Sequence, residues 1–168
     1  MAVEPLTYHN VIRVQIWGAN VTVLHGIPSY SIKKLQRVQN NAARIILGAP
    51  RRSHASQLFR TLHCLPVQQR IEYKVALLTF KVHSTSTPSY LCRLIQDREH
   101  GYNLRSATTT LCQPFTTTAF AKCTFRCSAS AVWNSLLKTV LSSDCVAVFK
   151  SRLKTFLFSR VFSLSFSQ

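Results

Sequence analysis

The chain has 168 residues, 46% of them hydrophobic, which is enough for one domain with a sizeable core. Its 21 lysine and arginine residues outweigh five acidic residues and give a formal charge of +16. Such a charge indicates an anionic partner, namely nucleic acid, an acidic membrane surface or an acidic protein. A pI near 10.3 favours nucleic acid. The alternative is a solvated basic surface with no dedicated partner.

Membrane and secretory roles are not expected. Lysine or arginine interrupts every apolar stretch, and no run approaches the roughly 18 apolar residues that a membrane-spanning helix needs. Residues 1–24 have no basic start and carry Glu4 and Pro5 early, unlike a signal peptide. We therefore expect a cytoplasmic or nuclear chain, in which the six cysteines are reduced thiols.

Taken in chain order, residues 1–30 show no steady period and predict a weakly structured segment, with a short strand near 11–16 or 20–24. A helix is predicted over 32–47, with Ser31 as its N-cap and Gly48 and Pro50 as its stop. Its apolar side would carry Leu35, Val38, Ala42, Ile45 and Ile46, while Lys33, Arg37 and Arg44 lie within roughly 40° of one another on the opposite side.

The middle of the chain predicts a short helix over 54–63, with Leu58, Phe59 and Leu62 facing inward. Pro66 suits the first turn of a helix that reaches His83, whose two apolar faces are typical of a central, buried helix. Pro88 opens another short helix that ends near Gly101. The threonine-rich stretch 102–126 predicts a loop with a short β-ribbon around Leu111 and Phe125.

Two helices are predicted in the C-terminal part. The first spans 129–138 and carries Val132, Trp133, Leu136 and Leu137. The second begins after Ser143, as its cap, with Asp144 in the first turn. Its apolar stripe would be Val146, Phe149, Leu153, Phe156 and Leu157.

The expected architecture is a mainly α bundle of about five to six helices with a minor β-ribbon. Its segments would be a weakly structured 1–30, a basic helical core over 31–100, a loop with the ribbon over 101–128, C-terminal helices over 129–158 and a frayed tail over 159–168.

Catalysis is not expected. Two-metal phosphoryl transfer needs neighbouring carboxylates, and the only aspartates, Asp97 and Asp144, are far apart in the sequence. A zinc site is conceivable from Cys123 and Cys127 with His100, Cys112 and Cys145, but the spacing is poor and core thiols are the favoured interpretation. His63 beside Cys64 lacks a third orienting group. We expect no metal, no cofactor and no small-molecule substrate.

The predicted binding residues are cations that contact phosphate backbone without reading sequence. Tyr102 or Trp133 would stack on unpaired bases, although core packing is the favoured interpretation of Trp133. The predicted cations are Lys33, Lys34, Arg37, Arg44, Arg51, Arg52, Lys150, Arg152 and Lys154.

Several phrases in fixed order carry a family resemblance. They are GIPSYSIKKLQRVQNNAARIIL (26–47), RRSHASQLFRTLHCLPVQQRIEYKVALLTFKV (51–82), PSYL, YNLRS, AVWNSL and VFKSRLKTFLF. Over roughly residues 20–160 the chain resembles the C-terminal region of LINE-type, non-LTR retrotransposon reverse transcriptases of the chicken-repeat and jockey-like groups. The resemblance implies a region downstream of the polymerase palm and thumb that helps to hold RNA or DNA. Departures before Val21 suggest a truncated or decayed start.

Three functions follow from these observations. The first is a non-catalytic, basic nucleic-acid-binding fragment of such a polymerase. The second is a structural module that braces the remainder of the polymerase. The third is a degenerate retrotransposon relic without a selected function.

Overall fold

The computed structural model describes residues 25–97 and 110–162, which form eight helices and no strand. The mainly helical class predicted from the sequence is confirmed. Five helices have seven or more residues, namely α2 (Ser29–Ile46), α3 (Ala55–Thr61), α4 (Val67–Thr85), α7 (Phe125–Asn134) and α9 (Val146–Phe162). Three are single turns, namely α5 (Ser89–Cys92), α6 (Ala119–Lys122) and α8 (Lys138–Leu141). The predictions for 1–24, for 98–109 and for the last six residues lie outside the described ranges.

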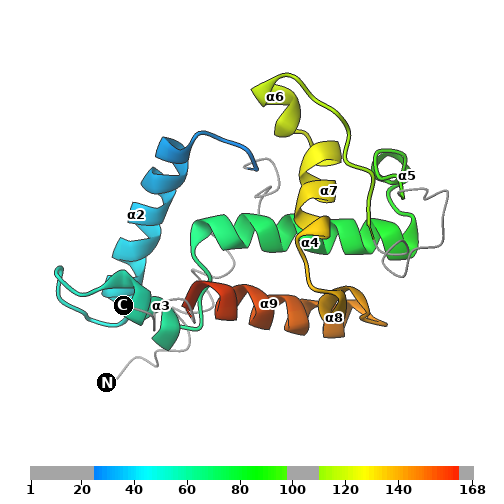
Figure 1. The fold of residues 1–168 in the computed structure, drawn as a ribbon. Coiled ribbons are helices and arrows are strands. Elements are labelled where there is room, and N and C mark those ends of the chain that lie inside the picture. The colour runs from blue at the N-terminus through cyan, green and yellow to red at the C-terminus, as the bar shows by residue number, and fades with distance from the viewer. Residues whose placement is uncertain (1–24, 98–109, 163–168) are drawn as a thin grey trace.

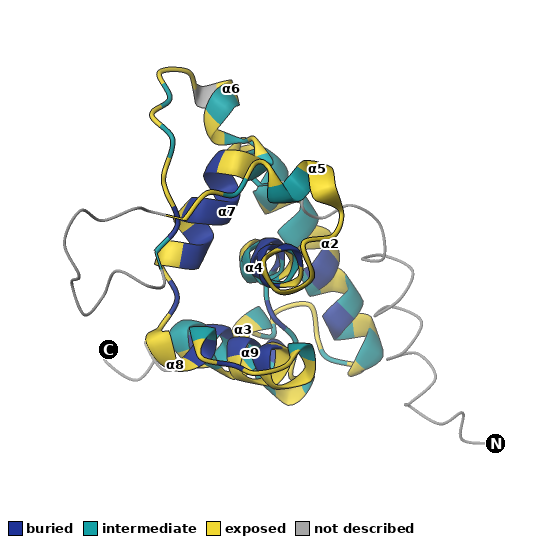
Figure 2. Ribbon diagram, turned by 90° about the vertical axis from the view of Figure 1, so that its right-hand side faces the viewer, coloured by how far each residue is buried: buried dark blue, intermediate teal, exposed yellow. Residues whose placement is uncertain are grey.

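Helix α4 is the centre of the fold, as its two apolar faces predicted. Figure 1 shows α9 running back along α4 in the opposite direction and α7 crossing it. In Figure 2, α4 is seen end-on at the centre, with α7, α9 and α2 around it. Val67, Ile71, Val75 and Val82 of α4 are all fully buried. The burial comes from both faces because helices cover both sides.

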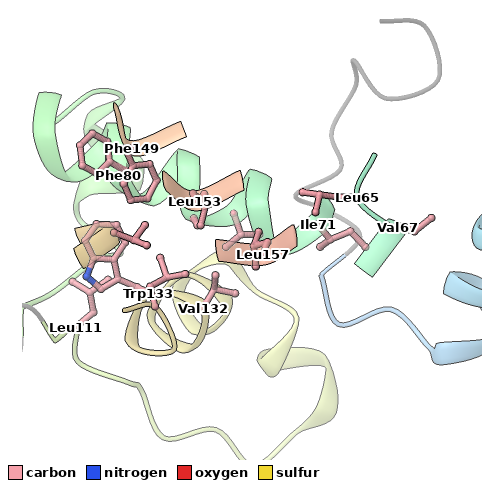
Figure 3. Close-up of a cluster of buried hydrophobic side chains, with 14 residues drawn as sticks. Leu65, Val67, Ile71, Phe80, Leu111, Val132, Trp133, Phe149, Leu153 and Leu157 are labelled. Carbon is pink, nitrogen blue, oxygen red and sulfur yellow. The ribbon is translucent and has the colours of Figure 1, made fainter. Parts of the chain in front are cut away.

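Aromatic rings fill one end of this core (Figure 3). The rings of Phe80 and Phe149 stack with centroids 4.1 Å apart, and Trp133 lies 6.1 Å from Phe149. Leu153 and Leu157 continue the buried row along α9. Trp133 is only 6% exposed, so its ring is part of the core and is not presented to a base. Of the two interpretations of Trp133, the structure confirms core packing and not base stacking.

A second, smaller cluster joins α3 to the ends of α2 and α9. Its buried members are Ala43, Phe59 and Phe162, and Leu58 and Leu62 pack against them, as predicted for α3. Phe158 of α9 packs against both clusters. A guanidinium N–H of Arg60 donates to the carbonyl of Phe162, which fastens α3 to the end of α9.

Two predictions for α2 are corrected by the structure. The helix begins at Ser29 after Pro28, so Ser31 lies in the first turn and is not the N-cap. Proline suits this position because it needs no backbone N–H partner. The buried face is centred on Gln39 and Ala43, whereas Val38 is exposed, as is Ile45. Gln39 is buried because its side-chain amide donates to the carbonyl of Leu65 at 2.9 Å.

The predicted β-ribbon is absent from the described part of 101–128. Leu111 forms an isolated antiparallel bridge with Asp97, and Phe125 begins α7. The Asn134 side chain bonds both the N–H and the carbonyl of Leu111, at 2.9 and 3.0 Å. These bonds use the groups that a strand would offer a neighbouring strand and tie the segment to α7 instead.

The C-terminal helices are shifted from their predicted bounds. Helix α7 spans Phe125–Asn134 rather than 129–138, and Leu137 follows it as an exposed residue. Ser143 does not cap α9, because its hydroxyl donates to the carbonyl of Val140 at 2.7 Å. Helix α9 begins at Val146 and extends to Phe162, into the stretch predicted to fray. Its predicted stripe is otherwise confirmed, with Phe149, Leu153 and Leu157 fully buried.

Candidate nucleic-acid interface

Helix α2 presents a row of cations to solvent. Lys33, Lys34 and Arg37 are all exposed, and the helix contains no acidic residue. They lie on the side opposite Gln39 and Ala43, which face α3 and α4. The opposite placement follows from the helical period of 3.6 residues, which separates the buried and the charged sets. An exposed row of this kind can contact several phosphates of one backbone.

Arg44 has a different environment from these three cations. Its guanidinium is half-buried and donates to the Asn41 side chain and to the carbonyl of Ser53, both at 3.3 Å. The Nε atom is buried and has no hydrogen-bond partner among the described residues. The structure therefore places Arg44 as a brace between α2 and the turn that follows it, although the sequence predicted a phosphate contact.

That turn carries two more of the predicted cations. Helix α2 ends at Ile46, and Gly48 follows with a φ of +58°, a conformation that glycine adopts without strain. Arg51 and Arg52 then lie exposed beyond the C-terminal end of α2. The negative end of the helix dipole favours cations at this position. They extend the exposed basic row from the helix into the turn.

The three predicted cations of α9 form a separate group. Lys150 is exposed and Lys154 half-buried, while Arg152 donates to the carbonyls of Thr139 and Ser142 at 3.0 and 3.4 Å. Arg152 therefore closes the C-terminal end of α8. Helix α9 lies along α4, whereas α2 projects from the other side of the N-terminal part of α4 (Figure 1). The structure does not bring this group together with the α2 row.

Two acidic residues within the described ranges have basic partners outside the α2 row. Glu72 pairs with Arg160, and Asp97 lies 3.4 Å from His83. No ion pair in residues 25–97 or 110–162 involves a cation of α2 or of the turn after it. The local field is therefore positive, and a polyanion is the ligand that it favours.

The two aspartates share one pocket, which the sequence did not indicate. The pocket has a volume of about 250 Å³ and lies where α4, α7 and α8 meet. Asp97 and His83 line it, together with Asp144, Trp133 and Phe80. Within the described residues, no group of three or more histidine, cysteine or acidic side chains is arranged to hold a metal ion.

The cysteines considered for a zinc site are dispersed. Cys127 is buried in α7, and Cys123 donates from its thiol to the carbonyl of Gly26 at 3.1 Å. Cys112 and Cys145 are exposed, and His100 lies outside the described residues. His63 stacks on Phe158, with ring centroids 5.9 Å apart and an interplanar angle of 10°. This contact gives His63 a packing role at the surface.

One aromatic residue of the α2 surface was missed by the sequence reasoning. Tyr30 lies in the first turn of α2 and is 61% exposed. The ammonium of Lys34 lies 5.5 Å from the centre of its ring. The sequence feature that could have indicated Tyr30 is its four-residue spacing from Lys34, which puts both residues on neighbouring turns of one helix face. Of the two stacking residues predicted instead, Trp133 is buried and Tyr102 lies outside the described residues.

No model of a known protein family, no curated protein and no solved structure matches the chain. Among the described residues, none of the helices combines the length and the apolar character needed to cross a bilayer.

Proposed function

We propose that the chain is a non-catalytic nucleic-acid-binding module that holds the phosphate backbone of RNA or DNA without reading its sequence. The observation that carries the proposal is the exposed basic row of Lys33, Lys34 and Arg37, continued by Arg51 and Arg52, in which no cation forms an ion pair within the described residues. Phosphate contacts position a nucleic acid and carry no sequence information directly. Such a role belongs in the cytoplasm or nucleus.

The resemblance to LINE-type reverse transcriptases supports the same proposal from the sequence. A C-terminal piece downstream of a polymerase palm would need to hold template or target strands, and it would leave catalysis to the palm. The remainder of such a polymerase is the protein partner that this origin implies. The strongly basic composition fits a piece that works beside nucleic acid.

The test is a double charge reversal, Lys33→Glu with Arg37→Glu, measured by fluorescence anisotropy on a labelled 20-nucleotide strand. We expect the affinity to fall by at least about tenfold, because two attractive contacts become repulsive. If about six phosphates are neutralised in the unaltered chain, log K falls with log salt at a slope of about −4 to −5. Loss of two contacts makes that slope shallower by about 1.5.

The matched control is Lys74→Glu with Lys81→Glu, which makes the same change of charge at two exposed positions of α4. Equal losses in the two variants would show that only net charge matters and would contradict a site on α2. A flat response from 50 to 200 mM salt would contradict backbone binding altogether. Circular dichroism spectra establish that both variants keep their helices.

A further inference from the structure

We propose that the α2 surface binds single-stranded nucleic acid in preference to duplex, with Tyr30 stacking on an unpaired base. This inference rests on the proposed function and names the class of ligand. The observation behind it is that exposed apolar side chains run along α2 beside its cations, which a phosphate-binding surface alone does not require.

The apolar row follows one side of the exposed face. Tyr30, Val38 and Ile45 are 61%, 55% and 80% exposed. At 100° per residue they fall within about 80° of one another, and Lys33 and Arg37 lie on the neighbouring side of the same face. Val38 and Ile45 are the residues that the hydrophobic pattern predicted for the core. Their exposure leaves an apolar strip without a partner in the described chain.

A single strand matches this arrangement in its chemistry. Its phosphates lie along one side and its unstacked bases along the other, so one rod can offer cations to the first and apolar surface to the second. A duplex shows phosphates at its perimeter and keeps its bases stacked inside, so Tyr30 and Val38 would gain little from it. A protein partner would need to supply acidic and apolar side chains in register, and nothing in the described chain indicates one.

The Tyr30 ring is suited to stacking. Its hydroxyl makes no hydrogen bond within the described chain, and the Lys34 ammonium 5.5 Å from the ring centre lies one turn further along. When a base stacks on Tyr30, the Lys34 ammonium would therefore be within reach of the phosphate of the same nucleotide. Aromatic stacking of this kind tolerates any base, which agrees with binding that does not read sequence.

A second exposed aromatic residue lies at the same end of the molecule. Phe120 of α6 is 83% exposed, and Lys122 of the same helix is also exposed. The thiol of Cys123 bonds the carbonyl of Gly26, so the end of α6 is held against the residues that lead into α2. Figure 1 shows α6 and the N-terminal end of α2 at the same end of the fold. A strand that passes Tyr30 thus has a further stacking position toward Phe120.

The experiment compares a 20-nucleotide single strand with a 20-base-pair duplex at one salt concentration, using the full chain. We expect the unaltered chain to prefer the single strand. Tyr30→Ala should weaken single-strand binding by about five- to 150-fold, the range seen for base–aromatic stacking, and leave duplex binding nearly unchanged. Tyr30→Phe should retain single-strand binding, because the ring is kept. Phe120→Ala should show a smaller loss of the same kind.

Tyr90→Ala is the matched control, since Tyr90 is a tyrosine of similar exposure on α5, and it should change neither affinity. If single strand and duplex bind equally and Tyr30→Ala changes neither, the inference is wrong while backbone binding stands. Equal loss on both ligands upon Tyr30→Ala would likewise overturn the stacking role. If the unaltered chain binds neither ligand at 50 mM salt, the proposed function itself fails.

Discussion

The two hydrophobic clusters differ in how much they bury and in what they leave exposed. The larger cluster, between α4, α7 and α9, contains Phe149, Leu153 and Leu157 with no more than 1% of their surface accessible. The smaller one, around Phe59, has three buried members. Most of the folding free energy gained from apolar burial therefore comes from the larger cluster.

The difference explains where the proposed binding surface lies. Within helix α2 only Gln39 and Ala43 are buried, and the helix is held partly by polar contacts, since Gln36 and Gln39 bond the backbone of Val67 and Leu65 at 2.9 Å. Ile32 and Leu35 are partly buried against the larger cluster, and the opposite side of the helix remains available to a ligand. Helix α4, covered on several sides, cannot offer a comparable surface. The larger cluster thus provides stability, and α2 provides the exposed surface.

The largest expected effect tests whether the larger cluster provides most of the stability. Phe149→Ala removes a ring that stacks on Phe80 at 4.1 Å, and it should lower the free energy of unfolding by about 3–5 kcal/mol. Urea denaturation followed by circular dichroism measures the change. Nucleic-acid affinity of the fraction that remains folded should be unaltered, because Phe149 lies away from α2.

Phe59→Ala is the counterpart in the smaller cluster. We expect it to increase amide hydrogen exchange mainly in α3 and the end of α2, because few other buried contacts hold that region. If Phe59→Ala lowers global stability as much as Phe149→Ala, the division of the two clusters is wrong.

The next prediction compares two arginines of α2, Arg44 with a structural role and Arg37 with a binding role. Arg44→Ala loses the bond to the Ser53 carbonyl and should lower the free energy of unfolding by about 1 kcal/mol. Arg37→Ala changes an exposed side chain and should alter that free energy by less than about 0.5 kcal/mol. Affinity for the 20-nucleotide strand should show the reverse order. A larger loss of affinity for Arg44→Ala would mean that it contacts phosphate directly.

The smallest effect concerns the residues that lead into α2. Burial lowers the pKa of His25 from its usual value near 6.5, and the nearby Glu72 carboxylate opposes this in part. The folded state therefore favours the neutral ring. Its contribution to stability is complete above pH 6.5 and is lost as the pH falls through the lowered pKa.

The urea midpoint should decrease between pH 7.5 and 5.5, and His25→Gln should make that decrease smaller. An identical pH dependence in the variant would contradict this role.

Local features of the sequence predicted the helices well where a proline or glycine marks a boundary. Pro66 precedes α4, Pro88 precedes α5, and Gly48 follows the end of α2. These residues act through their own backbone preferences, so no distant contact is needed to read them. The boundaries of α7 were predicted less well, and no proline or glycine marks either of them.

The sequence by itself determined the charge, the scarcity of carboxylates and the existence of most helices, because composition and local periodicity are properties of the chain alone. Only the tertiary structure decided which cations remain available. In the folded chain Arg44 donates a hydrogen bond to the carbonyl of Ser53, Val38 and Ile45 are exposed, and Trp133 lies in the core. The physical reason is that burial depends on partners distant in sequence. Gln39, for example, finds its acceptor on Leu65, and the buried face of α2 includes this residue instead of the exposed Val38 and Ile45.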